Sequence, residues 1–505
     1  MLYIALDIGT TTIKAAIFNE AGELIDSRER QSKLYTPEAG FREHDPDEVV
    51  TACLDLLKEI IDGRSSAEFG FLALSSYMHS LILVDEAGKP LTNCLLWNDA
   101  RSSAIAKELK NSELGDQLYH LTGTPIHPMS PLCKLRYFKE NAPELLAQAA
   151  KLASIKEYLV YKISGEWLSE YSSASGTGLF DQAQLKWSSE ALSYAGIEAE
   201  QLPKPVSVLT QLRWQKPEFL AAVGLDKPLT IVLGAGDGPL ANLGSRGLEP
   251  GSCICTIGTS AAVRVVSREL RLDSQGRIFS YILNPELNVA GGALNNGGIA
   301  YDWLRHSLGF DQHIDELISH LSPPEDERVG AGLIFLPFLS GERAPYWDAK
   351  LRASFIGLSQ EHDSLDLMVA GLRGICFAIR DVFDVLVEAT GEDVNAIYAN
   401  GGFCHSKYWL QLLADVLEKA VITLQGGGGP LFGAYLIGLQ AIGKLANQRA
   451  AAQYFVVEER FEPRIRESLR ENYKLYKRAI SLNQELMHEL SELQAQASNW
   501  LLRAK

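Results

Sequence analysis

The sequence lacks the features that mark membrane-spanning, secreted and disulfide-stabilised proteins. No apolar run approaches the roughly 18–20 residues that a transmembrane helix needs. The first ten residues, MLYIALDIGT, have neither the cationic segment nor the long apolar segment of a signal peptide. The seven cysteines are scattered and contain no C-x-x-C pair, so neither a disulfide framework nor a zinc site is indicated. These absences predict a cytoplasmic protein with reduced cysteines and no membrane partner.

Basic charge is also scarce. The chain has 47 Lys and Arg residues against 63 Asp and Glu residues, which gives a formal net charge of −16. Nucleic acids and anionic membranes both require a cationic face, so we expect no nucleic-acid partner. The Walker A pattern, a glycine-rich loop that ends in Gly-Lys and then Ser or Thr, does not occur. A P-loop kinase is therefore excluded.

The length and the pattern of the chain predict two α/β domains. The 505 residues exceed the roughly 250–300 residues at which a single core stops growing. Apolar strands are expected at residues 2–8, 13–18 and 70–76, and an amphipathic helix should begin at the Asp-Pro pair of residues 45–46. Such alternation of strands and helices is typical of α/β proteins. Gly and Pro cluster at residues 244–252, where we expect the boundary.

Two similar turns rich in glycine, threonine and serine stand between apolar strands. Residues 8–11 (Ile-Gly-Thr-Thr) and 257–260 (Ile-Gly-Thr-Ser) are the two copies, and such internal repetition indicates a duplicated fold. Consecutive backbone N–H groups in tight turns hold anions, so the pair could enclose a triphosphate. Asp7 precedes the first turn, whereas Thr256 stands at the equivalent place in the second. The lone carboxylate predicts a Mg²⁺ position; the alternative is an aspartate that only caps the turn.

A second carboxylate, Asp237, lies in the glycine-rich turn of residues 234–238, after an apolar strand. The glycines would let a substrate approach the backbone, and the carboxylate suits a general base that takes a proton from a hydroxyl. A dinucleotide-binding turn is the rival interpretation, but Pro239 and Leu240 stand where its third glycine is needed. Asp237 could also cap the following helix, and both roles could hold together.

Polar and aromatic side chains gather in two further segments of the first half. They are residues 78–80 (Met-His-Ser) and 97–101 (Trp-Asn-Asp-Ala-Arg). A tryptophan face beside several hydrogen-bonding groups suits a polyhydroxylated ligand. Each segment alone would more often be an ordinary surface or core feature, but two in one domain favour a sugar site.

The chain resembles the FGGY carbohydrate kinases over essentially its whole length. The matching segments are residues 7–14, with Asp-Ile-Gly-Thr-Thr and then Lys14, the turn at 234–238, the turn at 258–260, residues 341–348 and residues 401–415. Five ordered motifs at the family's spacing make this resemblance specific.

This resemblance implies a two-domain actin-like ATPase (ribonuclease H-like) fold with the active site in the cleft between the domains. The domains would be residues 1–247 on the sugar and phosphate side, residues 248–445 on the nucleotide side, and a helical extension at residues 446–505. ATP and Mg²⁺ would be the cofactors, Asp237 the catalytic base, and Asp7 and Asp237 the metal-binding carboxylates. The implied ATP-binding residues are Gly9, Thr10, Thr11, Thr12, Lys14, Gly258, Thr259, Gly298, Asp302, Gly402 and Ser406. The implied sugar-binding residues are Met78, His79, Trp97, Asn98, Arg101, His127 and Asp237.

Finer features resemble the branch of the family that phosphorylates D-gluconate to 6-phosphogluconate, above all residues 122–131 (TGTPIHPMSP). Two departures from the pattern are Tyr137, where a Trp is usual, and the glycine run at 426–429. A gluconate carboxylate needs a cation or several donors in an acidic protein. The candidate cations on the sugar side are His79, Arg101, His127, Lys134 and Lys156. For Lys134 and Lys156 a role as solvated helix residues is equally open.

Three alternatives stay open at this stage. The Met-His and Trp-Asn-Asp-Ala-Arg segments alone would also suit a xylulokinase or another pentulose kinase. A non-catalytic sugar or ATP sensor with the same fold is a rival from a different class, although the retention of Asp7 and Asp237 weighs against it. The sequence also leaves a homodimer open.

Overall fold

The computed structural model describes residues 1–214, 216–319, 328–425 and 428–503, with side chains up to Gln494. The chain divides into two compact units. Unit 1 comprises Met1–Glu249, Val266–Ala290 and Gly428–Phe455, and unit 2 comprises Pro250–Val265, Gly291–Gly427 and Val456–Lys505. The first boundary falls inside the expected Gly- and Pro-rich segment.

This division differs from the predicted domain boundaries, which fall after residues 247 and 445. Residues 428–455 belong to unit 1 because their helix α16 (Pro430–Ala441) packs against strands β1 (Leu2–Ile8) and β5 (Phe69–Ser76). Gly438 allows this close approach, since a β-carbon there would lie 2.1 Å from the Phe71 ring.

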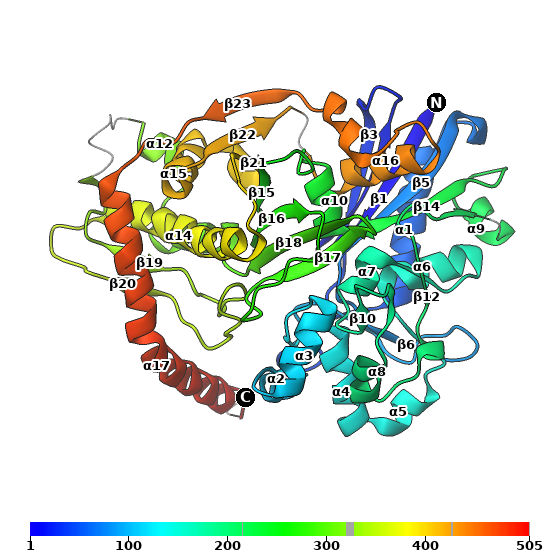
Figure 1. Cartoon of the computed structure of the whole chain (residues 1–505), viewed down its shortest axis with the longest axis horizontal. Helices are drawn as coiled ribbons and strands as arrows, with labels where there is room; N and C mark the ends of the chain where they lie inside the picture. Colours follow the sequence, from blue (N-terminus) through cyan, green and yellow to red (C-terminus); the bar gives the residue numbers. More distant parts are fainter. Residues whose placement is uncertain (215, 320–327, 426–427, 504–505) are drawn as a thin grey trace. The chain divides into compact units, whose positions relative to one another are not determined.

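Unit 1 is built on a six-stranded sheet with the order β13-β14-β5-β1-β2-β3 (Figure 1). Strand β1 pairs antiparallel with β2 (Thr12–Phe18) and parallel with β5, and β5 pairs parallel with β14 (Thr230–Gly236). The outer strands are β3 (Leu24–Gln31) and β13 (Gln211–Arg213). The three parallel strands β1, β5 and β14 therefore end at one edge of the sheet.

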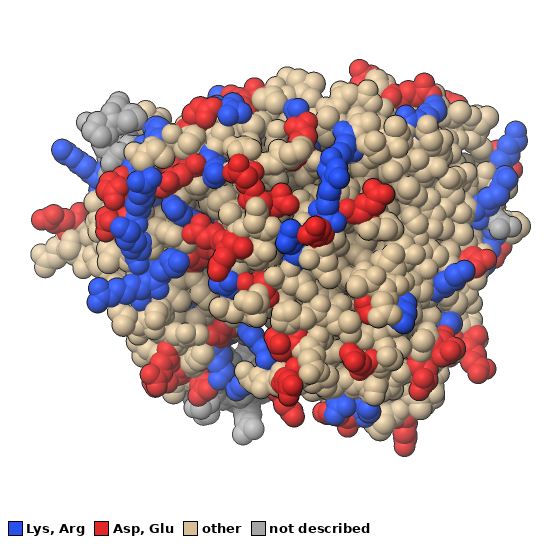
Figure 2. Space-filling view, viewed as in Figure 1, with Lys and Arg blue, Asp and Glu red and all other residues tan. Residues whose placement is uncertain are grey.

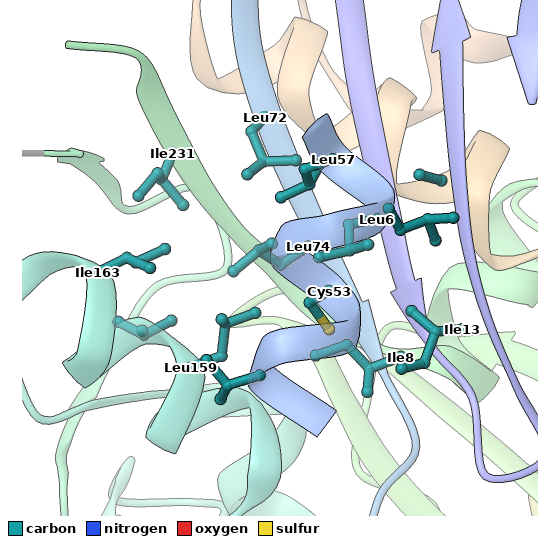
Figure 3. Close-up of a cluster of buried hydrophobic side chains, with 14 of the residues drawn as sticks. Leu6, Ile8, Ile13, Cys53, Leu57, Leu72, Leu74, Leu159, Ile163 and Ile231 are labelled. Atoms are coloured by element: carbon teal, nitrogen blue, oxygen red, sulfur yellow. The ribbon is translucent and has the colours of Figure 1, made fainter. Parts of the chain in front are cut away.

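Side chains alternate between the two faces of this sheet, as strand geometry requires. Ile4, Leu6 and Ile8 of β1 pack on the face covered by helices α1 (Pro46–Ile61) and α6 (Ile155–Ser164) (Figure 3). Tyr3 and Ala5 point to the opposite face, which α10 (Asp237–Leu243) and α16 cover. A third buried cluster joins α2 (Ser103–Lys110), α3 (Glu113–Thr122), α4 (Pro131–Asn141) and α8 (Ser189–Ala195).

Helix α1 begins as the sequence predicts. The Asp45 carboxylate accepts hydrogen bonds from the backbone N–H groups of Asp47 and Glu48, and Pro46 is the first helical residue. The predicted apolar stripe is buried. It consists of Val49, Cys53, Leu56, Leu57 and Ile60.

The sheet of β17-β18-β16-β15-β21-β22-β23 repeats the pairing pattern of the first sheet. Strand β15 (Ser252–Ile257) pairs antiparallel with β16 (Ala261–Ser267) and parallel with β21 (Ala396–Asn400), which pairs parallel with β22 (Ala420–Leu424). The same directions hold for β1 with β2, β5 and β14. The duplication predicted from the two turns is therefore present in the topology. The remaining strands are β17 (Phe279–Asn284), β18 (Leu287–Leu294) and β23 (Val457–Phe461).

The longest described helices of unit 2 lie in the second half of the chain. They are α11 (Gly298–Ser307), α14 (Ser364–Thr390) and α15 (Lys407–Leu417), followed by the long helix α17 (Glu467–Arg503). Cys253 and Cys255 of β15 are both buried, as small core residues would be. Within the described residues, no helix has the length and apolar content needed to cross a membrane. On the face drawn in Figure 2, acidic and basic side chains are interspersed.

Candidate active site

The two predicted carboxylates of unit 1 lie at the same edge of the sheet. Asp7 is near the end of β1, and its parallel partner in β5 is Ser75. Ser76 of β5 pairs in turn with Gly236, the last residue of β14, and Asp237 follows directly. Carboxyl ends of adjacent parallel strands are a common place for binding sites in α/β sheets.

Burial and charge both act on Asp7. The pKa of Asp7 is raised to about 7, mainly because the surrounding protein desolvates the carboxylate, and the nearby negative charge of Asp237 contributes to this rise. The Ser75 hydroxyl, which donates a hydrogen bond to Asp7 Oδ1 at 2.6 Å, and the ammonium groups of Lys14 and Lys156 act in the opposite direction. Two carboxylates at one site favour the binding of a cation.

The Asp237 turn depends on close backbone packing. Gly234 has φ +66°, and a β-carbon there would lie 1.8 Å from the carbonyl oxygen of Leu74. A β-carbon at Gly236 would lie 2.6 Å from the Met78 sulfur. Asp237 is the first residue of α10, and its Oδ1 accepts from the N–H of Gly238 at 2.7 Å. The alternative role of Asp237 as a helix cap was wrong, because Gly236 occupies the cap position.

Lys156 supports this turn from inside the protein. Its side chain is buried, its ammonium donates to the carbonyl oxygen of Ala235 at 2.9 Å, and it forms an ion pair with buried Glu170. Glu170 in turn accepts from the N–H of Ser173 at 3.0 Å. The idea of Lys156 as a solvated helix residue was therefore wrong.

His79 is held in an uncommon backbone conformation, with φ +66°. Its Nδ1 lies 2.7 Å from the carbonyl oxygen of Gly176, so Nδ1 carries the proton. Its Nε2 lies 3.3 Å from the hydroxyl of Tyr281, which therefore donates to it. Met78 is almost fully buried against Gly176 and Gly236. No local pattern pointed to Tyr281, which lies 202 positions from His79.

Lys134 links the two segments that carry His79 and Trp97 from the protein interior. Its side chain is fully buried, and its ammonium donates to the carbonyl oxygens of His79 at 2.6 Å and Leu96 at 2.7 Å. Desolvation lowers its pKa to about 7 against an ordinary value of 10.5. The alternative role of Lys134 as a solvated helix residue was therefore also wrong. Lys134 is buried and supports the segments that carry His79 and Trp97.

The segment at residues 97–101 connects the sugar side with the first phosphate turn. The Trp97 indole N–H donates to the Thr10 hydroxyl at 3.1 Å, and Asn98 is exposed. Arg101 is largely buried, with Nε 2.8 Å from Asp99 Oδ1 and Nη2 in an ion pair with Glu43. The Arg101 guanidinium is therefore already paired with two carboxylates.

The segment at residues 122–131 packs beside these groups. Gly123 accepts from the N–H of Ser280 at 2.9 Å, next to Tyr281, and the Ser102 hydroxyl donates to the carbonyl of Pro128 at 3.1 Å. His127 is partly exposed, and its Nδ1 accepts from the N–H of Met129 at 3.1 Å. The structure thus gathers every predicted sugar-side residue within unit 1.

Lys14 and the other turn residues of unit 1 sit nearby. Lys14 is the antiparallel partner of Asp7, and its ammonium lies 3.7 Å from Glu29 in an exposed ion pair. Gly9 makes the turn possible, since a β-carbon there would lie 2.3 Å from the carbonyl oxygen of Thr12. Thr11 is exposed and Thr12 begins β2.

In unit 2 the second turn meets the start of helix α11. The N–H of Gly298 donates to the carbonyl of Gly258 at 2.7 Å, and the N–H of Ile299 donates to that of Thr259 at 3.0 Å. A side chain at Gly258 would meet open space, whereas one at Gly298 would lie 2.6 Å from the Gly258 oxygen. This turn is thus exposed on one side and tightly packed on the other.

The remaining predicted nucleotide residues lie on three other elements of unit 2. Asp302 is exposed on α11, Gly402 begins a 3₁₀ turn, and Ser406 caps α15 by accepting from the N–H of Trp409 at 3.1 Å. Of the glycine run at 426–429, residues 426 and 427 lie outside the described residues.

The motif at residues 341–348 has a role that the sequence did not reveal. Buried Glu342 accepts hydrogen bonds from the N–H of Asn295, from the amide of Asn296 at 2.9 Å and from the N–H of Arg343 at 2.9 Å. Asn295 and Asn296 lead directly into Gly298. Glu342 therefore fixes the approach to α11.

Comparison with known proteins supports the same architecture. The chain matches the N-terminal domain of the FGGY family of carbohydrate kinases over residues 2–244 and the C-terminal domain over residues 253–442. A gluconokinase of Bacillus licheniformis is 36% identical over 97% of both chains, and a xylulose kinase of Staphylococcus epidermidis is 28% identical over 97% of both chains.

Solved structures of related kinases have the same fold. A gluconate kinase from Lactobacillus acidophilus has a TM-score of 0.88 and 30% identity, covering 96% of this chain and 98% of its own. A xylulose kinase from the same organism has a TM-score of 0.87 and 30% identity, with coverage of 95% and 98%. The two-domain actin-like fold predicted from the sequence is confirmed. The chain belongs to the FGGY family of carbohydrate kinases and is an ATP-dependent sugar kinase.

Proposed function

We propose that the protein transfers the γ-phosphate of ATP to the terminal hydroxyl of D-gluconate, giving 6-phosphogluconate. The observation that carries the choice of sugar is the higher sequence identity of this chain to gluconokinases than to xylulose kinases among the curated relatives. The gluconokinases are 34–36% identical to this chain, and the xylulose kinases 27–28%. The free cysteines and acidic charge fit a reaction in the cytoplasm.

In the proposed reaction the Asp237 carboxylate accepts the proton of the sugar hydroxyl as its oxygen attacks the γ-phosphorus and ADP leaves. The close packing at Gly234 and the Lys156 hydrogen bond to Ala235 hold the Asp237 turn in place. The turns at residues 9–12 and 258–259 would hold phosphates through backbone N–H groups and hydroxyls.

Asp7 and Asp237 fit a Mg²⁺ site. Mg²⁺ usually binds one or two carboxylates, with water and substrate phosphates as its other ligands. Within the described residues, no group of three or more His, Cys, Asp or Glu side chains is arranged for a metal ion. When bound, Mg²⁺ would neutralise charge on the transferring phosphate.

The candidate cations for the gluconate carboxylate are fewer than the sequence suggested. Lys134 and Lys156 are buried, with their ammonium groups directed to protein carbonyls. Arg101 uses Nε and Nη2 on Asp99 and Glu43. We propose that Nη1 of Arg101 and the imidazole of His127 provide the donors for the carboxylate. His79, whose ring nitrogens contact Gly176 and Tyr281, would line the sugar site without donating to the carboxylate.

The test is ADP release with D-gluconate, D-xylulose, L-ribulose, glycerol, D-glucitol or no sugar. We expect release with gluconate and little with D-glucitol, which has the same carbon chain but no carboxylate. Asp237→Asn should fold and bind ATP yet lose at least about 10³-fold in turnover, as expected on removal of a general base.

Two outcomes would contradict the proposal. A preference for D-xylulose would reassign the protein to the pentulose kinases, while equal release without any sugar would remove the kinase role. Substantial turnover in Asp237→Asn would remove Asp237 from the base role, whichever sugar is used.

A further inference from the structure

Helix α17, drawn in red in Figure 1, is joined to the loop at residues 341–348 by the carboxylate of Asp348. Oδ2 of Asp348 lies 2.6 Å from Nε2 of His488, so Nε2 carries a proton, and it also accepts from the Gln484 amide at 3.2 Å. Oδ1 accepts from the N–H of Lys350 at 2.9 Å. Burial works against the charge on Asp348, but the hydrogen bonds, that of His488 first, hold its pKa below the ordinary value. The carboxylate therefore stays charged at neutral pH and binds the loop to α17.

The loop is closed on itself between Glu342 and Asp348. The N–H of Glu342 donates to the carbonyl of Asp348 at 2.9 Å, and the N–H of Asp348 donates to the carbonyl of Glu342 at 2.8 Å. The two residues thus form a short antiparallel bridge. Because of this bridge, a displacement of Asp348 also displaces Glu342.

The side chain of Glu342 carries the connection to the second phosphate turn. It is buried, and it accepts from the N–H of Asn295 and from the Asn296 amide. Two positions after Asn296, the N–H of Gly298 donates to the carbonyl of Gly258 at 2.7 Å. The path from α17 to the turn at residues 258–259 therefore consists of hydrogen bonds and short stretches of backbone, all within unit 2.

The last step of this path leaves little room for adjustment. A β-carbon at Gly297 would lie 2.6 Å from the carbonyl oxygen of Ser260, and one at Gly298 would lie 2.6 Å from that of Gly258. Closely packed protein interiors transmit displacements rather than absorb them. A shift at the start of α11 should therefore move the turn.

We propose that His488 is a positioning residue for the nucleotide. Through Asp348 and Glu342 it fixes the turn at residues 258–259, so that α17 sets the affinity for ATP without touching it. The inference rests on the nucleotide role proposed for this turn and does not depend on which sugar the enzyme phosphorylates.

The test is calorimetric titration of the full chain with ADP and Mg²⁺, which needs no sugar. His488→Leu should bind ADP at least about fivefold more weakly than the wild type, as expected for a residue that acts at a distance. The KM for ATP should rise by the same factor while the KM for the sugar stays within about twofold of its original value. His488→Gln, which retains an N–H donor for Asp348, should bind ADP nearly as the wild type does. Glu485→Leu, at an exposed position of the same helix, is the matched control and should also bind normally.

A double-variant cycle tests whether the effect runs through Asp348. Asp348→Asn and His488→Leu should each weaken ADP binding. The double variant should bind no more weakly than the weaker of the two single variants, because both changes break the same contact. Losses that simply add would overturn this path.

Glu342→Gln separates a failure of this link from a failure of the proposed nucleotide site. If Glu342→Gln weakens ADP binding and His488→Leu does not, the turn binds nucleotide but α17 does not position it, and the inference is overturned. If neither variant changes the affinity, the nucleotide role of the turn fails as well. Equal rises in the KM values for ATP and the sugar, or no recovery in His488→Gln, would show a general loss of packing and would also overturn the positioning role.

Discussion

Internal charges position the side chains of the candidate sugar site in unit 1. Lys134 and Lys156 are buried, and each donates to backbone carbonyls at the site rather than to solvent. Burial of a charge is costly unless hydrogen bonds satisfy it, so such groups persist only where the structure provides partners. Lys134 links the carbonyls of His79 and Leu96 and so couples the two sugar-side segments.

Lys134→Met should remove a pH-dependent part of the stability. The pKa of Lys134 is about 7 in the folded chain against an ordinary 10.5, so between these values the unfolded chain holds the proton and the folded chain does not. Stability from this group therefore rises with pH across that window, by up to about 1.4 kcal/mol per pH unit. Denaturant unfolding at several pH values should show this slope in the wild type and its loss in the variant.

The same substitution should also affect sugar binding. Without the Lys134 amino group, the carbonyls of His79 and Leu96 lose their donor, so the KM for the sugar should rise at least about tenfold while the KM for ATP stays near its original value. Lys139→Met, at an exposed position of the same helix α4, is the matched control. Equal changes in both KM values would contradict a positioning role.

Whole elements take their positions from single buried contacts. The segment at residues 341–348 holds the start of α11 through Glu342 and is tied to α17 through the contact between Asp348 and His488. The Tyr346 hydroxyl donates to Asp381 of α14, which also accepts from Tyr473 of α17. Three helices and one loop thus share a small polar network in unit 2.

Glu342→Gln should weaken nucleotide binding. A glutamine offers one acceptor oxygen and one NH₂ group where the carboxylate accepts from three N–H donors, so one donor is left unpaired at a cost of about 1–3 kcal/mol. Under the proposed function, the KM for ATP should rise by roughly tenfold or more while that for the sugar changes little. Glu361→Gln, at an exposed glutamate of unit 2, should leave both values unchanged. A selective rise in the sugar KM would contradict this assignment.

For the molecule as a whole, ligand binding should be visible as stability. A ligand that binds only the folded chain raises the free energy of unfolding by about 2.7 kcal/mol at 100 times its dissociation constant. Under the proposed function, D-gluconate should raise the melting temperature and D-glucitol should not. His79→Ala should abolish the shift with gluconate and keep the shift with ATP. A shift with D-xylulose alone would favour a pentulose kinase.

Local patterns in the sequence determined much of this protein. The cap of α1 at Asp45, the two repeated turns and the glycine-rich segment around Asp237 were all recognisable. Each depends on residues within a few positions of one another, where backbone geometry and strand alternation act directly. The order of these motifs along the chain also indicated the family and, through the family, the fold.

The tertiary structure alone decided what the charged and aromatic residues near the site do. Lys134 meets its carbonyl partners across 55 and 38 positions, and Tyr281 meets His79 across 202. The sequence of a helix does not show whether a lysine in it is solvated or fully buried. Its pKa and partners follow from packing between distant segments, which no local pattern encodes. For the same reason, only the structure showed which leucines of α17 face its own unit and which face outward.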